Sequence, residues 1–155
     1  MLGSIIVANV STLTTISSPN LTTITEQCVL ENLPLLSNLT LPSWTSVDTL
    51  ILNQIPTPNT LNMQTTFQQV TNLYITNTSL EVLPGLLLQA SQMDVLSITD
   101  NAYLNSAYFG VGNITQQAII MGNGGQMTLE MPNLTYAYNM NISNASVISM
   151  PSLMS

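Results

Sequence analysis

Eight asparagines of this sequence can carry chemistry, because each stands in an N-x-S/T sequon, the acceptor pattern for N-linked glycans in secreted proteins. One sequon is a weak signal in a chain rich in Asn, Ser and Thr, but eight in 155 residues are more than incidental. We predict N-linked glycans as covalent partners, with Asn20 and Asn133 as the best acceptors because each directly follows a proline at an equivalent corner. The other acceptors, in decreasing order of preference, are Asn38, Asn113, Asn141, Asn9, Asn144 and Asn77. Asn141 and Asn144 are too close for both to be modified readily.

The seven acidic residues offer little to catalysis, because the chain contains no Lys, Arg or His. Neither a Ser-His-Asp nor a Cys-His arrangement exists within it, and it has no ready general base near pH 7. A paired-carboxylate glycosidase, for instance with Asp94 and Asp100, stays formally open, but only the presence of acids supports it. We predict no enzymatic activity, no catalytic residue and no cofactor.

A second reading of the acids is metal binding, because Glu26, Asp48 and Asp94 occupy one position of the repeat described below. Stacked carboxylates without a cation could hold Ca²⁺. Solvated acids that point apart explain the pattern more simply, and no aspartate-rich calcium loop is present. We predict no metal site. Cys28 is the only cysteine, and we expect a small buried hydrophobic residue there.

The charge balance restricts the partners of the chain. A net charge of −7 without any cation argues against nucleic acid and anionic membrane surfaces. Charged residues make up 5% of the chain, against about 25% in a typical domain, so solubility must come from Asn, Ser, Thr and Gln or from attached sugar. No apolar run reaches the roughly 18 residues of a membrane span. The ends resemble neither a signal peptide nor a lipid-anchor signal, so we expect part of a longer chain or a processed core.

Short strand-like runs recur along the whole sequence, and their spacing predicts the fold. The runs start at residues 5, 28, 50, 73, 96, 118 and 140, at steps of 22 or 23. Such a period indicates a stack of repeats in which each rung contacts mainly its neighbours. Prolines in the quartets SPNL, LPSW, MPNL and MPSL mark the corners, and the last quartet comes three residues early. We predict one all-β domain over 1–155, a parallel β-solenoid of about seven rungs with little or no helix.

Alternation within the runs assigns two faces. The first and third residues of each run point inward, and the second residue points outward. Four successive outward residues are apolar and form a strip that we interpret as a candidate partner surface, or as a face covered by another part of the protein: Ile6, Val29, Ile51 and Tyr74.

The residue that ends each run forms a further column. It consists of Asn9, Asn32, Gln54, Asn77, Asp100, Gly122 and Asn144. Amides stacked about 4.8 Å apart can hydrogen-bond along a solenoid and satisfy turn backbone groups. Alternation makes Asn77 nominally inward-facing, although the turn could swing its side chain outward, and we favour a role in this ladder over a role as a glycan acceptor.

Several phrases of the sequence resemble a known family. They are NLTTI, LPLLSNLTLPSWTSV, VTNLYITNTSLEVLPGL, LSITDNAYLNS and MPNLTYAYNMNISNASVISMPSL. Together they resemble the fungal GPI-anchored cell-wall glycoproteins of the sporulation-specific and extracellular-mutant family, which have receptor-L-domain-like, leucine-rich-like repeats. The resemblance implies a secreted, heavily glycosylated, right-handed β-helix that serves cell-wall integrity and touches the membrane only through a lipid anchor. It implies no catalytic residues.

Three functions remain open from the sequence. The first is a structural glycoprotein of the cell wall. The second is a module that binds carbohydrate or another partner, with sugar-stacking candidates at Tyr74, Tyr103, Tyr108, Tyr136 and Tyr138. The third is a solenoid whose ends associate into extracellular filaments through exposed strand edges.

Overall fold

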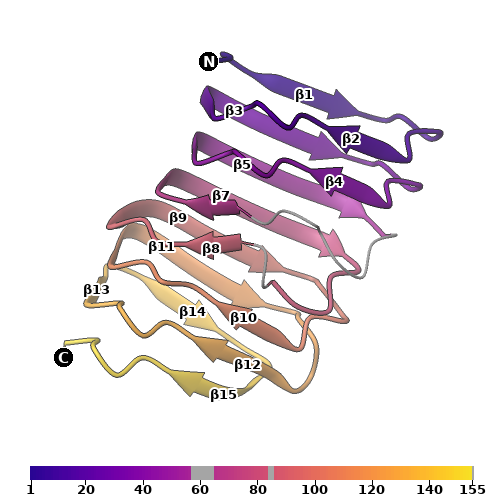
Figure 1. The fold of residues 1–155 in the computed structure, drawn as a ribbon. Coiled ribbons are helices and arrows are strands. Elements are labelled where there is room, and N and C mark those ends of the chain that lie inside the picture. The colour runs from indigo at the N-terminus through magenta and orange to yellow at the C-terminus, as the bar shows by residue number, and fades with distance from the viewer. Residues whose placement is uncertain (57–64, 84–85, 155) are drawn as a thin grey trace.

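The chain is an all-β stack of strands (Figure 1). The computed structural model describes residues 1–56, 65–83 and 86–154, and no helix occurs among them. The strands are β1 (Ile5–Ala8), β2 (Thr15–Ser17), β3 (Thr23–Glu31), β4 (Asn38–Thr40), β5 (Ser46–Ile55), β6 (Thr65–Phe67), β7 (Gln69–Thr78), β8 (Leu86–Leu88), β9 (Gln92–Thr99), β10 (Ser106–Tyr108), β11 (Asn113–Met121), β12 (Met127–Glu130), β13 (Tyr136–Ala137), β14 (Met140–Ile142) and β15 (Ala145–Ser149).

One long parallel sheet carries the repeat. Its strand order is β1-β3-β5-β7-β9-β11-β13, and β14 also pairs with β11. The seven predicted starting residues pair in one row, so the predicted register is confirmed: Ile5, Cys28, Leu50, Leu73, Leu96, Ala118 and Met140. Residues that are one repeat apart in the sequence are therefore direct neighbours on adjacent strands of the sheet.

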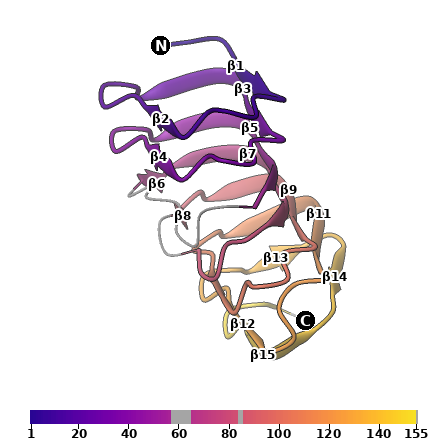
Figure 2. The same ribbon diagram turned by 90° about the vertical axis from the view of Figure 1, so that its right-hand side faces the viewer.

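Shorter parallel sheets close the other side of the solenoid. They are β10-β12-β15, β2-β4 and β6-β8. Figure 2 shows the rungs stacked from the N-terminus to the C-terminus, each passing from the long sheet to the short strands and back. The seven rows of the long sheet enclose about six complete turns, slightly fewer than the predicted seven, because the last row is followed only by a partial turn.

The core is a continuous apolar column inside the stack. The inward residues of the middle rungs are at most 1% exposed, as the alternation predicts: Cys28, Leu30, Leu50, Leu52, Leu73, Ile75, Leu96, Ile98, Ala118 and Ile120. Ile5 and Val7 in the first rung, and Met140 and Ile142 in the last, are only partly buried because each has a neighbouring rung on one side only. Trp44 and Phe67 pack edge-to-face inside, with ring centroids 4.9 Å apart.

The proline quartets form tight turns at equivalent corners. In each quartet the first carbonyl accepts a hydrogen bond from the fourth N–H, over 3.2–3.3 Å, at Leu21, Trp44, Leu134 and Leu153. The hydroxyl of Ser43 donates to the Pro19 carbonyl (2.8 Å), and that of Ser152 donates to the Pro132 carbonyl (2.7 Å). The early fourth quartet is thus the same corner, reached through a shorter rung.

Candidate functional site

The residue that ends each strand of the long sheet adopts a left-handed backbone conformation. The φ angles lie between 49° and 65° at Asn9, Asn32, Gln54, Asn77, Asp100, Gly122 and Asn144, which is the predicted column. Asn, Asp and Gly tolerate this region better than other residues, which explains the composition of the column. The left-handed residue bends the chain at the end of the strand.

The nominal inward orientation that alternation gives Asn77 is wrong, because the turn swings this column outward. All seven members are exposed, whereas the following residue is buried in the five middle rungs. Alternation fails here because a residue with positive φ does not continue the pleat. Within the column, only Asn32 and Asn9 form the expected amide pair, in which Asn32 Nδ2 donates to Asn9 Oδ1 (2.8 Å).

The buried polar ladder lies one residue later in the repeat. Asn101 is fully buried, and its Oδ1 accepts hydrogen bonds from the Thr78 N–H (3.0 Å) and the Thr78 hydroxyl (2.6 Å). Its Nδ2 donates to the Ile75 carbonyl, the Thr99 carbonyl and Asn123 Oδ1, each at 3.0 Å. Asn123 Nδ2 in turn donates to the Ile98 carbonyl (2.8 Å). This ladder joins side chains of three rungs, satisfies backbone groups of two of them at and near the turn, and has a structural role.

The repeat places a groove beside the strand ends. Among the described residues, it is lined by Asn32, Gln54 and Asn77 of the strand-end column, and by Pro34 and Pro56, two residues further along their rungs. The intervening residues Leu33, Ile55 and Thr78 are at most 5% exposed. The groove has a volume of about 260 Å³. Sequence reasoning missed it, because it follows from the outward turn of the strand-end column.

The other sequon asparagines also reach the surface. Asn113 is half-buried, and the remaining seven of the eight are exposed. The Asn38 Oδ1 accepts from the Thr40 hydroxyl of its own sequon (2.7 Å), and the Asn113 Oδ1 accepts from the Thr135 hydroxyl (2.9 Å). Asn133 Nδ2 donates weakly to the Gly110 carbonyl (3.3 Å). The fold therefore hides none of the candidate acceptors.

The apolar strip stands in one row on the outer face of the long sheet. Ile6, Val29, Ile51 and Tyr74 pair successively in register. Ile6 is 61% exposed, and the other three are half-buried between their neighbours. The remaining tyrosines are exposed and lie outside this strip: Tyr103, Tyr108, Tyr136 and Tyr138.

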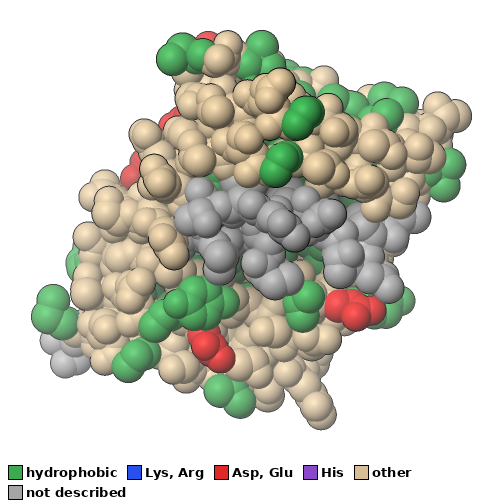
Figure 3. All heavy atoms as spheres, viewed as in Figure 1, with side chains coloured by type: hydrophobic (Ala, Val, Ile, Leu, Met, Phe, Trp, Pro, Cys, Tyr) green, Lys and Arg blue, Asp and Glu red, His purple; other side chains and the backbone are tan. Residues whose placement is uncertain are grey.

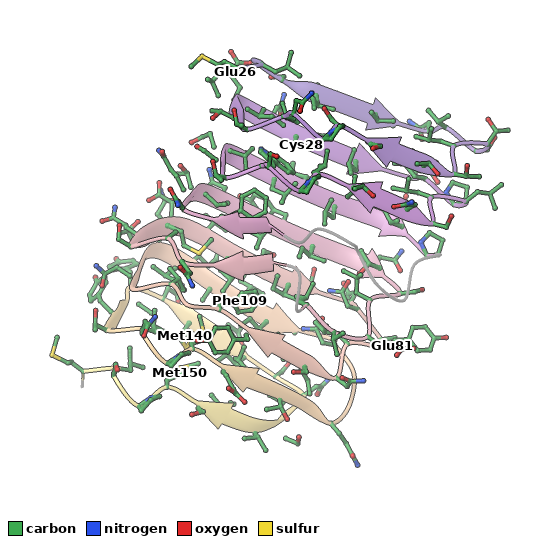
Figure 4. The ribbon with its side chains drawn as sticks, viewed as in Figure 1. Glu26, Cys28, Glu81, Phe109, Met140 and Met150 are labelled. Atoms are coloured by element: carbon green, nitrogen blue, oxygen red, sulfur yellow. The ribbon has the colours of Figure 1, made fainter. Side chains whose placement is uncertain are left out.

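The acidic residues do not converge. Asp94 accepts from the Thr115 hydroxyl (2.5 Å) and from Gln116 Nε2 (3.0 Å), whereas Asp100 stands after the other end of β9. Six residues of strand separate their backbones by roughly 20 Å. A glycosidase pair needs carboxyl groups about 5–10 Å apart, so this pair does not fit that chemistry. Glu26 and Glu81 also lie at opposite sides of the stack (Figure 4).

Among the described residues, no three His, Cys, Asp or Glu side chains come together at a metal-binding distance. Glu26 and Asp48 are both exposed, and the Ser4 hydroxyl donates to Glu26 Oε2 (2.6 Å). Two members of the column of acids are therefore exposed, and the third, Asp94, is half-buried and bonded to its neighbours.

Cys28 is buried, and desolvation raises the pKa of its thiol from 9.0 to about 12. Because the folded chain holds this proton more tightly, stability is unaffected below pH 9 and falls as the pH rises from about 9 to about 12. We expect native protein at pH 8 to resist iodoacetamide and unfolded protein to react fully. In Cys28→Ala the loss of stability above pH 9 should be smaller than in the unsubstituted chain. An equal loss in both would show that the thiol does not contribute.

Comparison with known proteins identifies the group to which these features belong. The chain is 32% identical to the protein ecm33 of Aspergillus fumigatus over 147 residues, which are 94% of the chain and 36% of that relative. It is 36% identical to a cell surface GPI-anchored protein of Arthroderma benhamiae over 144 residues, 92% of the chain and 37% of the relative. The chain is a homologue of these fungal cell-surface proteins. Sporulation-specific protein 2 of Saccharomyces cerevisiae is more distant, at 22% identity over 81% of the chain and 25% of its own length.

The resemblance inferred from the sequence phrases is thereby confirmed. The homology places the chain at the cell surface or cell wall of a fungus. The chain spans about a third of the length of its two more similar relatives. No protein-family model and no solved structure matches it. Within the described residues, no helix has the length and apolar composition that crossing a membrane requires.

Proposed function

We propose that this chain is a non-enzymatic, heavily N-glycosylated structural segment of a fungal cell-wall protein. The observation that carries this proposal is the placement of the sequons, of which seven asparagines are exposed and one is half-buried. Glycans on them would coat a solenoid in which charged residues make up only 5% of the chain. The homologues are cell-wall-associated proteins, which agrees with such a role.

The composition of the surface supports the proposal. Figure 3 shows a face made mostly of uncharged polar side chains and backbone, with scattered hydrophobic groups, few acids and no basic side chain. Because only seven side chains of the chain are charged, most of the hydration of this surface comes from neutral polar groups. Glycans provide such hydration, and their placement on an unbroken solenoid leaves the core undisturbed.

The test is deletion of the gene that encodes this chain in its own organism. We expect increased sensitivity to dyes that bind wall polysaccharides, restored by the intact gene. A variant that lacks the eight sequon hydroxyl residues, made by Ser→Ala and Thr→Ala changes, should restore growth only partly. Full dye resistance in the deletion strain would contradict a role in wall integrity.

A second proposal concerns the strip formed by Ile6, Val29, Ile51 and Tyr74. Its in-register stacking favours a partner surface, because an apolar row on a solvent-facing sheet is unusual for an isolated face. We expect Ile51→Ser to reduce retention of the full-length protein in the wall fraction, with unchanged circular dichroism. Asn53→Ser on the same strand is the matched control. Equal retention of both variants would remove the strip from consideration.

A further inference from the structure

The groove beside the strand ends has the chemistry of a site for a neutral sugar. It presents amides on three successive rungs, at Asn32, Gln54 and Asn77, and two proline rings, and none of the described residues that line it is charged. Among the described residues, the side chain of Gln54 has no hydrogen-bond partner, and Asn32 Oδ1 likewise accepts none. These atoms can therefore bond to hydroxyl or acetamido groups, and the proline rings can cover the apolar face of a sugar ring.

One of the residues that line the groove is itself a candidate glycan acceptor. Asn77 belongs to the sequon Asn77-Thr78-Ser79, and its φ of 52° turns the side chain out of the stack. The following residue, Thr78, is anchored by its hydroxyl and N–H to buried Asn101. The backbone at Asn77 is thus held on both sides, by β7 before it and by the buried ladder after it. A sugar attached at this point would start inside the groove.

We propose that Asn77 carries an N-linked glycan whose first sugars lie in this groove, against Gln54, Asn32 and the proline rings. The inference rests on the proposed glycosylation of the chain. Neighbouring rungs are about 4.8 Å apart, comparable to the length of a pyranose ring, so two sugars reach from Asn77 past Gln54 toward Asn32. The glycan would then contact the turns of three neighbouring rungs.

The attachment chemistry is ordinary for a secreted protein. Asn77 Nδ2 displaces the diphosphate from the anomeric carbon of a lipid-diphosphate-linked oligosaccharide. A C–N bond forms, the C–O bond to the diphosphate breaks, and the amide loses one proton. The remaining N–H and the carbonyl of the amide stay in the groove wall.

The experiment is a double-mutant cycle on the chain secreted from yeast. Ser79→Ala removes the sequon but keeps Asn77, and Gln54→Gly removes the amide while accepting the φ of 52° at that position. Thr22→Ala, which removes the sequon of the corner residue Asn20, is the matched control for loss of a glycan. The measurement is the thermal midpoint, together with the mass of the Asn77 peptide.

We expect a glycan on Asn77, a midpoint lowered by about 2–4 °C in Ser79→Ala, and a smaller change in Thr22→Ala. Gln54→Gly should lower the thermal midpoint more in the glycosylated chain than in the Ser79→Ala background, because only the glycosylated chain loses a sugar contact. Trimming to a single sugar with an endoglycosidase should keep the contact with Gln54 but remove the part of the effect that depends on the second sugar.

Three outcomes would overturn the proposal, and they are distinguishable from failure of the wider function. An unmodified Asn77 beside modified Asn20 and Asn133 would refute the site while leaving the glycosylated solenoid intact. A modified Asn77 with additive effects of the two variants would refute docking in the groove. A third outcome is that loss of the Asn77 glycan does not change the thermal midpoint, while added chitobiose raises the midpoint of the Ser79→Ala chain. This result would assign the groove to a free saccharide.

Discussion

Asn101→Leu should reduce the free energy of unfolding by about 3–5 kcal/mol, one of the largest effects of a single substitution in this chain. The asparagine is fully buried, and five hydrogen bonds to other residues of the stack depend on its side chain. Leucine has a similar volume, so the change creates little cavity. It leaves the Thr78 N–H and the Thr78 hydroxyl without their acceptor in a dry interior, where an unpaired group costs about 1–3 kcal/mol. Asn123 Oδ1 keeps only its hydrogen bond from the backbone N–H of residue 101 (3.2 Å).

The measurement is urea unfolding followed by far-UV circular dichroism. Asn105→Leu is the matched control, because Asn105 is exposed and should change stability by no more than about 0.5 kcal/mol. Equal stabilities of the two variants would show that the buried ladder does not hold the turns together.

Trp44→Ala should destabilise the chain to a similar extent, by about 3–5 kcal/mol. Trp44 is fully buried, and its ring packs at 76° against Phe67 on the next rung. Its Nε1 donates to the Ser46 carbonyl (2.9 Å), which fixes the chain as it leaves the corner. Truncation empties the centre of a rung and leaves that carbonyl without its side-chain donor.

Trp44→Phe separates the two contributions, because it keeps an aromatic ring but removes the N–H donor. We expect an intermediate loss of stability, measured by the same urea unfolding. Tyr103→Ala serves as the control, since Tyr103 is 65% exposed. A loss in Trp44→Ala no larger than that in Tyr103→Ala would contradict the packing described for the core.

The spacing of the runs was sufficient to predict the long sheet in detail. Steps of 22 or 23 residues placed Leu50 beside Leu73, and that pairing is present in the structure. The reason is physical: in a parallel stack each rung repeats the same path, so sequence period and sheet register are the same quantity. The alternation also predicted which residues of each run are buried.

The turn at the end of each strand could not be predicted by the same rule. Alternation was extended to Asn77, although a residue with positive φ interrupts it. The apolar residues Leu33 and Ile55, one position later in the repeat, were a signal that this later position faces inward. With that signal, Asn101 and Asn123 would have been recognised as the buried ladder. The groove is lined by residues of three rungs, so the residue pattern within a single rung does not predict it.

The structure therefore shows where the side chain of Asn77 lies, which the two sequence motifs left open. The ladder role belongs to the next position, and Asn77 itself is exposed. Its modification stays a prediction, as does that of the other seven sequons. Several of these asparagines lie in corners and turns, which a stacked solenoid presents to solvent, whereas Asn38, Asn113 and Asn141 lie in strands.

Site-resolved mass spectrometry of the chain secreted from yeast tests the central claim most directly. Enzymatic release of N-glycans in ¹⁸O-labelled water marks each occupied asparagine by conversion to labelled aspartate. A sugar-coated solenoid predicts high occupancy at Asn20 and Asn133, and modification of most of the other sequons. A folded, soluble chain that leaves all eight asparagines unmodified would contradict the account.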